Sequence, residues 1–327
     1  MLRFVYSLLF CFIYFVGFSQ TNIKPFASHN QGPLIHSFGL PNVQGGRIVE
    51  EGKFSMSSIF NLSSNSTSAL FQDEFVYFDG EMARLDLNAK YGITERLEIG
   101  LNLPFVNHSS GFMDSSIDGF HSGIGIGGGA RSVMPKGEML YMYSRDSIVL
   151  FHFNESSFGV GDISLELGFK LLEHKTHSMA LRAYLKLNNA DKQKLLGSGT
   201  TDFSVQFSGQ TTGLGPRPAY FFYSLGYLRI GKGSILEDMQ IRNIGFGSLG
   251  LAVKATSLFV PKIQFDYHSA FYKNTITEEL GDSGLQLLLG ADFILNENLI
   301  LTGGFSEDIK INTSPDFLLH IALNYTF

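Results

Sequence analysis

The stretch Arg84-Leu85-Asp86-Leu87-Asn88-Ala89-Lys90-Tyr91 alternates strictly between polar side chains at even positions and apolar side chains at odd positions. After a turn near 93–96 the same phase resumes, because every odd position from 97 to 105 is apolar. Successive side chains of a β-strand point to opposite faces of the sheet. These residues therefore predict a β-hairpin with one apolar face and one polar, largely charged face.

The same alternation recurs along the rest of the chain and predicts an all-β protein of about 12 strands. The expected strands lie at about 52–64, 80–92, 97–106, 161–172, 178–188, 201–211, 218–228, 243–256, 259–272, 284–295, 299–307 and 316–327. The stretch from Ser147 to Phe153 is a candidate for an additional strand.

The connections between these strands favour a transmembrane antiparallel β-barrel over a soluble sandwich. Short turns are expected near 93–96, 173–177, 213–217, 257–258 and 296–298. The connections between them are mostly longer, and the extreme case spans about 106–160. Short periplasmic turns and longer outside loops are typical of bacterial outer-membrane barrels, and an even strand number places both termini in the periplasm. We therefore expect the protein in the outer membrane, with lipid around its wall.

The end of the chain supports the same interpretation. From 317 to 327 the odd positions are apolar or aromatic up to the terminal Phe327. This ending resembles the C-terminal signal by which the barrel-insertion machinery recognises outer-membrane proteins, so that machinery is an expected partner. The sequence has no Trp, so Tyr and Phe must form any aromatic girdle. The candidates are Tyr91, Phe105, Phe271, Tyr272, Tyr325 and Phe327.

The beginning of the chain has the layout of a secretory signal peptide, which we place at residues 1–19. A basic start at Arg3 precedes an apolar run from 4 to 18, with small residues before the expected cleavage at Ser19–Gln20. The only cysteine, Cys11, leaves with this peptide, and thiol chemistry leaves with it. Residues 20–50 then form a periplasmic segment that could plug or cap the barrel of residues 51–327.

The net charge of −6 argues against a nucleic-acid partner, which would need a basic surface. The polar strand face predicts a lumen of mixed charge. Its candidate residues are Arg84, Asp86, Lys90, Glu98, Asp162, Glu166, Lys170, Arg182, Lys186, Lys262, Asp266, His268, Asp292 and His320. These groups could pair across a narrow barrel and close it, or line a polar path for a small solute. A twelve-stranded barrel lies between the filled eight-stranded and open sixteen-stranded cases, and leaves both alternatives open.

The connection at 108–146 is long enough to be functional. Asp114, Asp118 and His121 share one face if this stretch is helical. Two carboxylates and an imidazole could hold a metal, but an amphipathic helix with a solvated polar face is favoured, and no metal or cofactor is expected. The glycine tract 123–131 lacks the strand and helix of a dinucleotide fingerprint and indicates turns instead.

Several motifs resemble an uncharacterised family of predicted bacterial outer-membrane β-barrel proteins, a domain of unknown function. They are the stretch from Asn30 to Pro41, Asp79-Gly80-Glu81, the segment from Gly111 to Arg131, and Gly159-Val160-Gly161-Asp162. The resemblance implies a barrel and carries no activity. It does favour Asp114, Asp118, His121 and Arg131 as one functional loop.

Three functions are compatible with this pattern. The leading hypothesis is a narrow channel or solute-binding barrel gated by the loop 108–146. The alternative is a non-transporting scaffold, either structural or partner-binding, whose lumen is blocked by paired charges or by residues 20–50. The third is a lipid-modifying hydrolase on the barrel wall, with His121 or His268 as candidate bases, although no His lies in a Gly-x-Ser-x-Gly motif.

Overall fold

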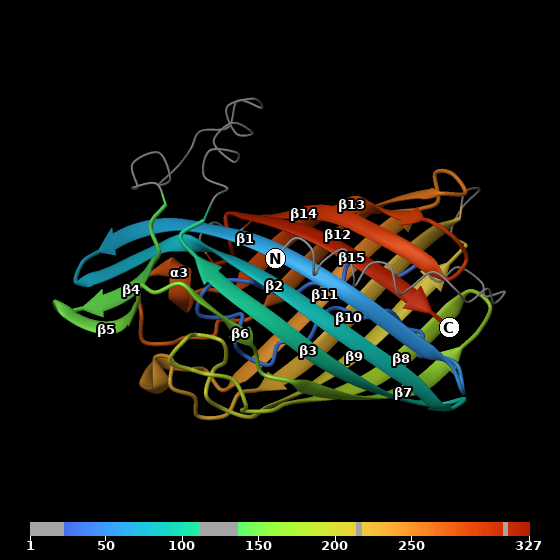
Figure 1. Ribbon diagram of the computed structural model, residues 1–327, viewed down its shortest axis with the longest axis horizontal. Helices are drawn as coiled ribbons and strands as arrows, with labels where there is room; N and C mark the ends of the chain where they lie inside the picture. The colour runs from blue at the N-terminus through green and yellow to red at the C-terminus, as the bar shows by residue number, and fades with distance from the viewer. Residues whose placement is uncertain (1–22, 112–136, 214–217, 310–312) are drawn as a thin grey trace.

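The computed structural model describes residues 23–111, 137–213, 218–309 and 313–327, which form a closed antiparallel β-barrel (Figure 1). The barrel closes because the first strand pairs with the last over ten residue pairs. Twelve strands make the wall. They are β1 (Phe54–Phe71), β2 (Glu74–Thr94), β3 (Leu97–Ser109), β7 (Ser164–Glu173), β8 (His177–Lys186), β9 (Asp202–Thr212), β10 (Ala219–Arg229), β11 (Asn243–Val253), β12 (Phe259–His268), β13 (Gly284–Ile294), β14 (Leu299–Asp308) and β15 (Phe317–Thr326).

The predicted fold class and strand number are confirmed, and the alternation has the predicted sense. In the hairpin of β2 and β3, Leu87 pairs with Leu103 on the outer face, while Asp86 is fully buried in the interior. The strands β1 and β2 are longer than expected. β1 continues beyond residue 64, β2 begins before residue 80, and the two meet at a two-residue turn at 72–73. The expected long connection there is therefore an extended hairpin.

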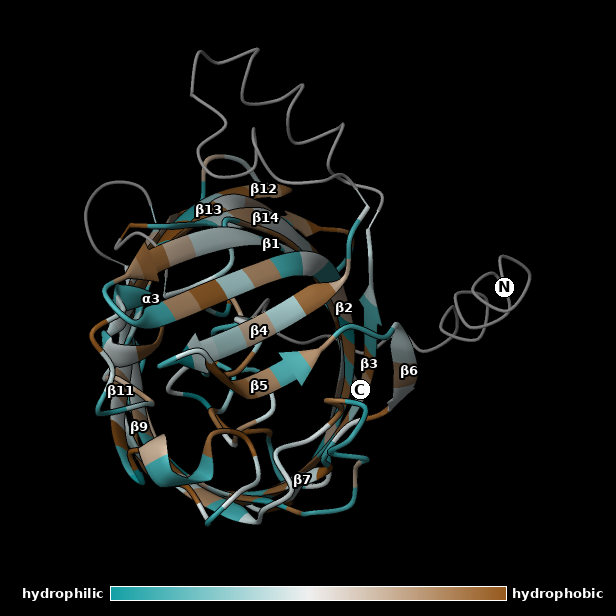
Figure 2. Cartoon of the chain, turned by 90° about the vertical axis from the view of Figure 1, so that its left-hand side faces the viewer, coloured by the Kyte–Doolittle hydropathy of each residue, from teal (hydrophilic) through white to brown (hydrophobic). Residues whose placement is uncertain are grey.

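Three further strands lie at the end of the barrel that carries the long connections. They are β4 (Leu140–Arg145), β5 (Ile148–Phe153) and β6 (Ser157–Val160). β4 pairs with the extension of β2, β5 pairs with β4, and β6 pairs with the last residues of β3. The candidate strand at 147–153 thus exists as β5 but stands outside the closed ring. In the end-on view, β4 and β5 cross the mouth of the barrel (Figure 2).

The outer face of the wall is apolar in the manner that lipid requires. Large aliphatic side chains in mid-strand point outwards, such as Leu225, which is 70% exposed, and Leu249, which is 54% exposed. No helix in the described ranges is long and apolar enough to cross a bilayer. Two of the expected girdle residues were assigned wrongly, because Phe271 and Tyr272 are buried inside. The chain after β12 folds inwards there, and the Tyr272 hydroxyl donates to the Leu34 carbonyl.

An apolar core fills the long-connection end of the lumen. Its centre is the segment from Leu34 to Leu40, and residues of β2, β4, β5 and the loops after β8, β10 and β12 pack around it. The members Tyr141 and Tyr143 of β4 are completely buried. This end of the barrel is therefore closed by hydrophobic packing.

The outward face can be tested with a charge. We predict that Leu225→Arg lowers the free energy of unfolding in phospholipid bilayers by about 2–4 kcal/mol, because it places a cation near mid-bilayer. Leu258→Arg, at an exposed short turn, is the control and should cost less than about 1 kcal/mol. Denaturant titration of both variants in vesicles measures the difference, and equal costs would contradict this placement of the wall.

Candidate functional site in the barrel lumen

Residues 23–50 lie inside the barrel and cross its lumen twice. The first limb runs extended along the inner face of β12 in the same direction as that strand. Four contacts share a constant spacing of 238 residues. They join Phe26 to Gln264, Ser28 to Asp266, Asn30 to His268 and Leu34 to Tyr272. The first three pairs share it because both segments are extended there and have a period of two, whereas Leu34 lies in the turn that follows.

We call these contacts between the first limb and β12 the ladder, and each is a specific hydrogen bond. Gln264 accepts a hydrogen bond from the Phe26 amide at 2.8 Å, and its own amide donates to the Phe26 carbonyl at 3.1 Å. The Ser28 hydroxyl donates to the Asp266 carboxylate at 2.6 Å. Because backbone groups away from water need partners, the wall side chains here replace the strand neighbour that the limb lacks.

The limb then turns at 32–38 within the apolar core. The rings of Phe38 and Phe271 stack at 5.5 Å, and the ring of His36 contacts that of His108 at 5.1 Å. Burial lowers the pKa of His36 well below its ordinary value and that of His29 to about 4. Both imidazoles of the segment are therefore neutral at pH 7, because burial disfavours the charged form.

The second limb returns along β9, β8 and β3. The Gly39 amide donates to Asp202 at 2.9 Å, and the Val49 amide donates to Glu98 at 2.7 Å. At Gly46 an added Cβ would lie 2.1 Å from the Ser178 carbonyl oxygen. The backbone of this limb thus touches the wall directly, which only glycine permits.

A cluster of four charges on the wall anchors the second limb. Arg182 forms ion pairs with Glu98 at 2.8 Å and Glu166 at 3.2 Å, and Lys90 pairs with Glu166. The same guanidinium donates to the carbonyls of Gly45 at 2.7 Å and of residue 47 at 2.6 Å. Its planar fork of donors suits this simultaneous contact with carboxylates and carbonyls.

Further ion pairs lie inside the wall. Lys186 lies 2.7 Å from Asp162 and 3.3 Å from Asp202, and it also donates to the Thr200 carbonyl, which fixes the loop after β8. Lys262 lies 2.6 Å from Asp292. These pairs join wall residues to each other rather than to the central segment.

The remaining candidates are placed as follows. Arg84 pairs with Asp86 at 3.0 Å and donates to the His36 carbonyl. His320 contacts Asn61 within the wall. Lys170 differs from the rest, because it lies at the short-turn end and pairs with Glu173. Lys170 pairs with Ala180, which is buried in the interior, and the irregularity of the strand pairing begins only after Lys170.

Asp114, Asp118, His121 and Arg131, the expected functional loop, lie outside the described residues. The expected signal peptide, with Cys11, lies outside them as well. In the described ranges, no group of three His, Cys, Asp or Glu side chains could hold a metal. His268, a candidate hydrolase base, contacts Asn30 and the Ser269 carbonyl.

Asp202, Lys24 and Arg47 belong to the site but were not among the lumen residues predicted from the sequence. Asp202 occupies an inward position of β9, which its alternation with Phe203 already indicates. Lys24 and Arg47 belong to the segment that threads the lumen, which has no sustained alternation, so the pattern gives no signal for them.

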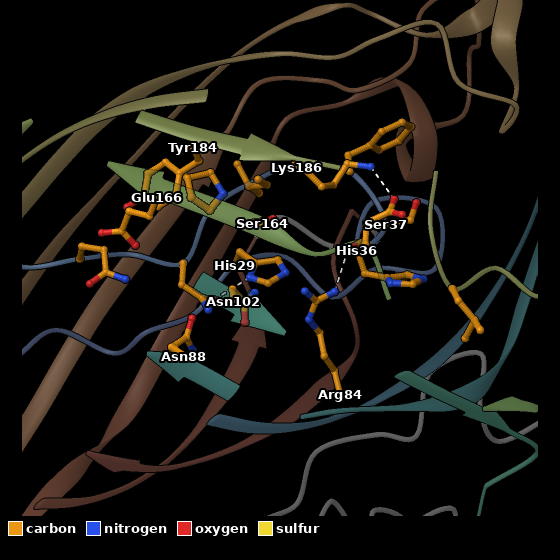
Figure 3. A pocket seen from close by; sticks show the side chains of 18 residues that line it. His29, His36, Ser37, Arg84, Asn88, Asn102, Ser164, Glu166, Tyr184 and Lys186 are labelled. Atoms are coloured by element: carbon orange, nitrogen blue, oxygen red, sulfur yellow. Dashed lines mark hydrogen bonds and ion pairs between the residues drawn. The ribbon is translucent and has the colours of Figure 1, made fainter. Parts of the chain in front are cut away.

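Cavities with polar linings lie beside the segment. The largest described one, of about 910 Å³, which we call the vestibule, opens at the short-turn end between the segment and β1, β2, β14 and β15. A smaller cavity of about 50 Å³ has the lining residues Gln44 and Asn88 in common with it. Figure 3 shows His29, His36 and Arg84 around the smaller cavity. Its lining includes Phe38 and Leu40, which belong to the apolar core that fills the long-connection end of the lumen.

Solved structures of similar shape are bacterial outer-membrane barrels. The COG4313 outer membrane channel from Pseudomonas putida F1 has a TM-score of 0.56 and 14% identity, over 86% of this chain and 98% of that chain. The NanC porin has a TM-score of 0.45 and 7% identity, over 83% and 98%. The toluene transporter TodX from Pseudomonas putida has a TM-score of 0.38 and 11% identity, over 94% and 99%.

At such identity the first of these likenesses shows the fold alone, and the fold is that of an outer-membrane β-barrel, as the sequence predicts. No curated protein matches the chain. Residues 11–327, nearly the whole sequence, match the family described as "Protein of unknown function (DUF3187)". The resemblance seen in the sequence motifs is thereby confirmed, and the chain belongs to this family.

Proposed function

We propose that the protein is a narrow channel of the outer membrane, closed in this conformation by residues 23–50. In this proposal the short turns and both termini face the periplasm, as the organisation of bacterial barrels favours, and the vestibule opens to that side. Phe327 remains the proposed contact for the insertion machinery. Gating by the loop 108–146 stays a prediction, because most of that loop lies outside the described residues.

The observation that carries the proposal is the pairing of the wall charges with each other. Arg182 with Glu98, Lys186 with Asp162 and Lys262 with Asp292 remain paired if residues 23–50 move away. An unpaired buried charge costs several kcal/mol. Withdrawal of the segment breaks hydrogen bonds to its backbone but leaves these three wall cations paired. The segment is therefore suited to act as a removable plug.

The route follows from the cavities. The smaller cavity lies next to β2, β3, β7 and β8, and the vestibule lies towards the short-turn end, where β1, β2, β14 and β15 line it. Beyond them, in the described part of the chain, the turn of the segment and the apolar core around Leu34 and Phe38 close the long-connection end. Movement of the turn would join the two sides through a polar passage.

A second function is favoured by the same apolar core. Loops after β8, β10 and β12 and the strands β4 and β5 all bury side chains against residues 34–40. A core of this size would also suit a permanently closed barrel that serves as a scaffold or binds a partner. The two functions differ in whether the barrel ever conducts.

Conductance in planar bilayers decides between them. For the intact mature chain we expect brief, small openings. A variant that lacks residues 23–46 should give steady, larger steps, because the lumen then holds only the paired wall charges. Heat-modifiable gel mobility confirms folding of both barrels. If both are folded and silent, the channel proposal is wrong and the scaffold is favoured.

The anchor of the second limb gives a local test. We predict that Arg182→Gln speeds hydrogen exchange of the Val49 amide about a hundredfold, because loss of one partner of a buried charge cluster costs about 3 kcal/mol. The Phe26 amide, held by Gln264 on the opposite wall, should change little. Lys170→Gln, which removes a partly exposed ion pair, is the control. Equal exchange at Val49 in all three proteins would show that Arg182 does not hold the limb.

A further inference from the structure

The inner end of the vestibule has an excess of positive charge. Lys24, Arg47, Lys90 and Arg182 line it, and the carboxylates of their cluster are Glu98 and Glu166. Those two carboxylates pair with Lys90 and Arg182. In the described part of the chain, neither Lys24 nor Arg47 has a carboxylate within 4 Å.

The two unpaired cations have few other partners. Lys24 makes one long hydrogen bond of 3.5 Å to the Ser55 hydroxyl. The Nε atom of Arg47 is buried and makes no hydrogen bond. Burial lowers the pKa of Lys24 to about 8; the charges of Lys90 and Arg182 act in the same direction, and those of Glu98 and Asp292 oppose them. Lys24 is still mainly charged at pH 7, and the two carboxylates near it are paired with Arg182 and Lys262.

The rest of the vestibule narrows the ligand class. The other charged side chains of its lining are Lys53, Lys175, Glu50, Glu173 and Glu297, which carry one net negative charge, so the excess of positive charge is confined to the cluster. The opposite wall, formed by β1, β14 and β15, carries neutral hydrogen-bonding groups. They are Ser55, Ser57, Thr302, His320, Asn324 and Thr326. A ligand that fits has a negative group at the inner end and hydroxyl groups along this wall.

We propose that the vestibule binds a small hydroxylated carboxylate, of the size of a sugar acid, and that Lys24 and Arg47 attract its carboxylate. A volume of about 910 Å³ accommodates such a molecule. The inference deepens the proposed channel by naming the class of its solute, and in that respect it rests on the channel. Both cations belong to the plugging segment, so an anion that enters the vestibule contacts the plug first.

Thiol labelling measures the local potential without any need for conduction. The expected mature chain lacks cysteine, so Ser57→Cys places a single thiol in the vestibule. We expect it to react faster with a negatively charged methanethiosulfonate reagent than with a positively charged one. Normalised to Leu258→Cys at an exposed turn, the preference should be about tenfold, as expected for two net charges near the thiol.

Variants assign the preference to the two cations. Adding Lys24→Gln and Arg47→Gln to Ser57→Cys should reduce the ratio to that of the exposed turn. The exchange Lys24→Arg with Arg47→Lys should keep it, which controls for folding. Lys175→Gln, at the rim, should change it less than twofold. A ratio near that of the turn in the parent, or an unchanged ratio in the double Gln variant, would overturn the proposal.

Competition tests the chemical class. D-glucuronate should slow labelling of Ser57→Cys by the negative reagent, and D-glucose, which has the same ring but no charge, should not. Equal effects of the two sugars, or no effect of glucuronate, would overturn the assignment of a hydroxylated carboxylate. A silent barrel that keeps the labelling preference rejects the channel and retains the site. A conducting barrel without the preference rejects the site alone.

Discussion

A strand that crosses lipid must turn every second side chain into the barrel, and charged side chains placed there must find partners among themselves. This constraint organises the whole interior. Arg182 with Glu98 and Glu166, Lys186 with Asp162, and Lys262 with Asp292 satisfy each other across neighbouring strands. Because these cations are paired within the wall, their partners do not change when they offer hydrogen bonds to the backbone of residues 23–50.

The central segment and the wall meet in two different ways. On β12 the contact is a ladder between two extended chains, with Gln264 acting as a substitute for a strand neighbour of Phe26. On β8 the contact is a single anchor, in which Arg182 binds two carbonyls close to Gly46. The ladder spreads its energy over many weak contacts, whereas the anchor concentrates it in one guanidinium. Local changes near Arg182 should therefore free the second limb before the first.

The alternation in the sequence was enough to predict the wall. The hairpin that begins at Arg84 has the predicted phase, and the barrel has the predicted number of strands, because period-two patterning in lipid-facing strands is a strong constraint. Outside the lipid-facing strands, this pattern is absent and the sequence predicted the structure less well. The extension of β1 and β2 beyond the membrane and the inward position of Tyr272 depend on tertiary contacts with β4 and with Leu34. The charges of the lumen segment, Lys24 and Arg47, gave no pattern because an irregular chain has no period. The loop that carries Asp114 and His121 lies outside the described residues, so its role stays a prediction.

The most direct test of the account is a disulfide between the segment and the wall, in a mature chain without other thiols. A Cβ at Gly39 would lie 2.8 Å from that of Asp202, close enough for a bond after a small adjustment. We predict that Gly39→Cys with Asp202→Cys crosslinks under mild oxidation and abolishes channel openings, and that reduction restores them. The pair Gly39→Cys with Gln286→Cys, on the distant strand β13, should not crosslink. Failure of the first pair to crosslink, or unchanged conductance after it does, would contradict the placement of residues 23–50 as the plug.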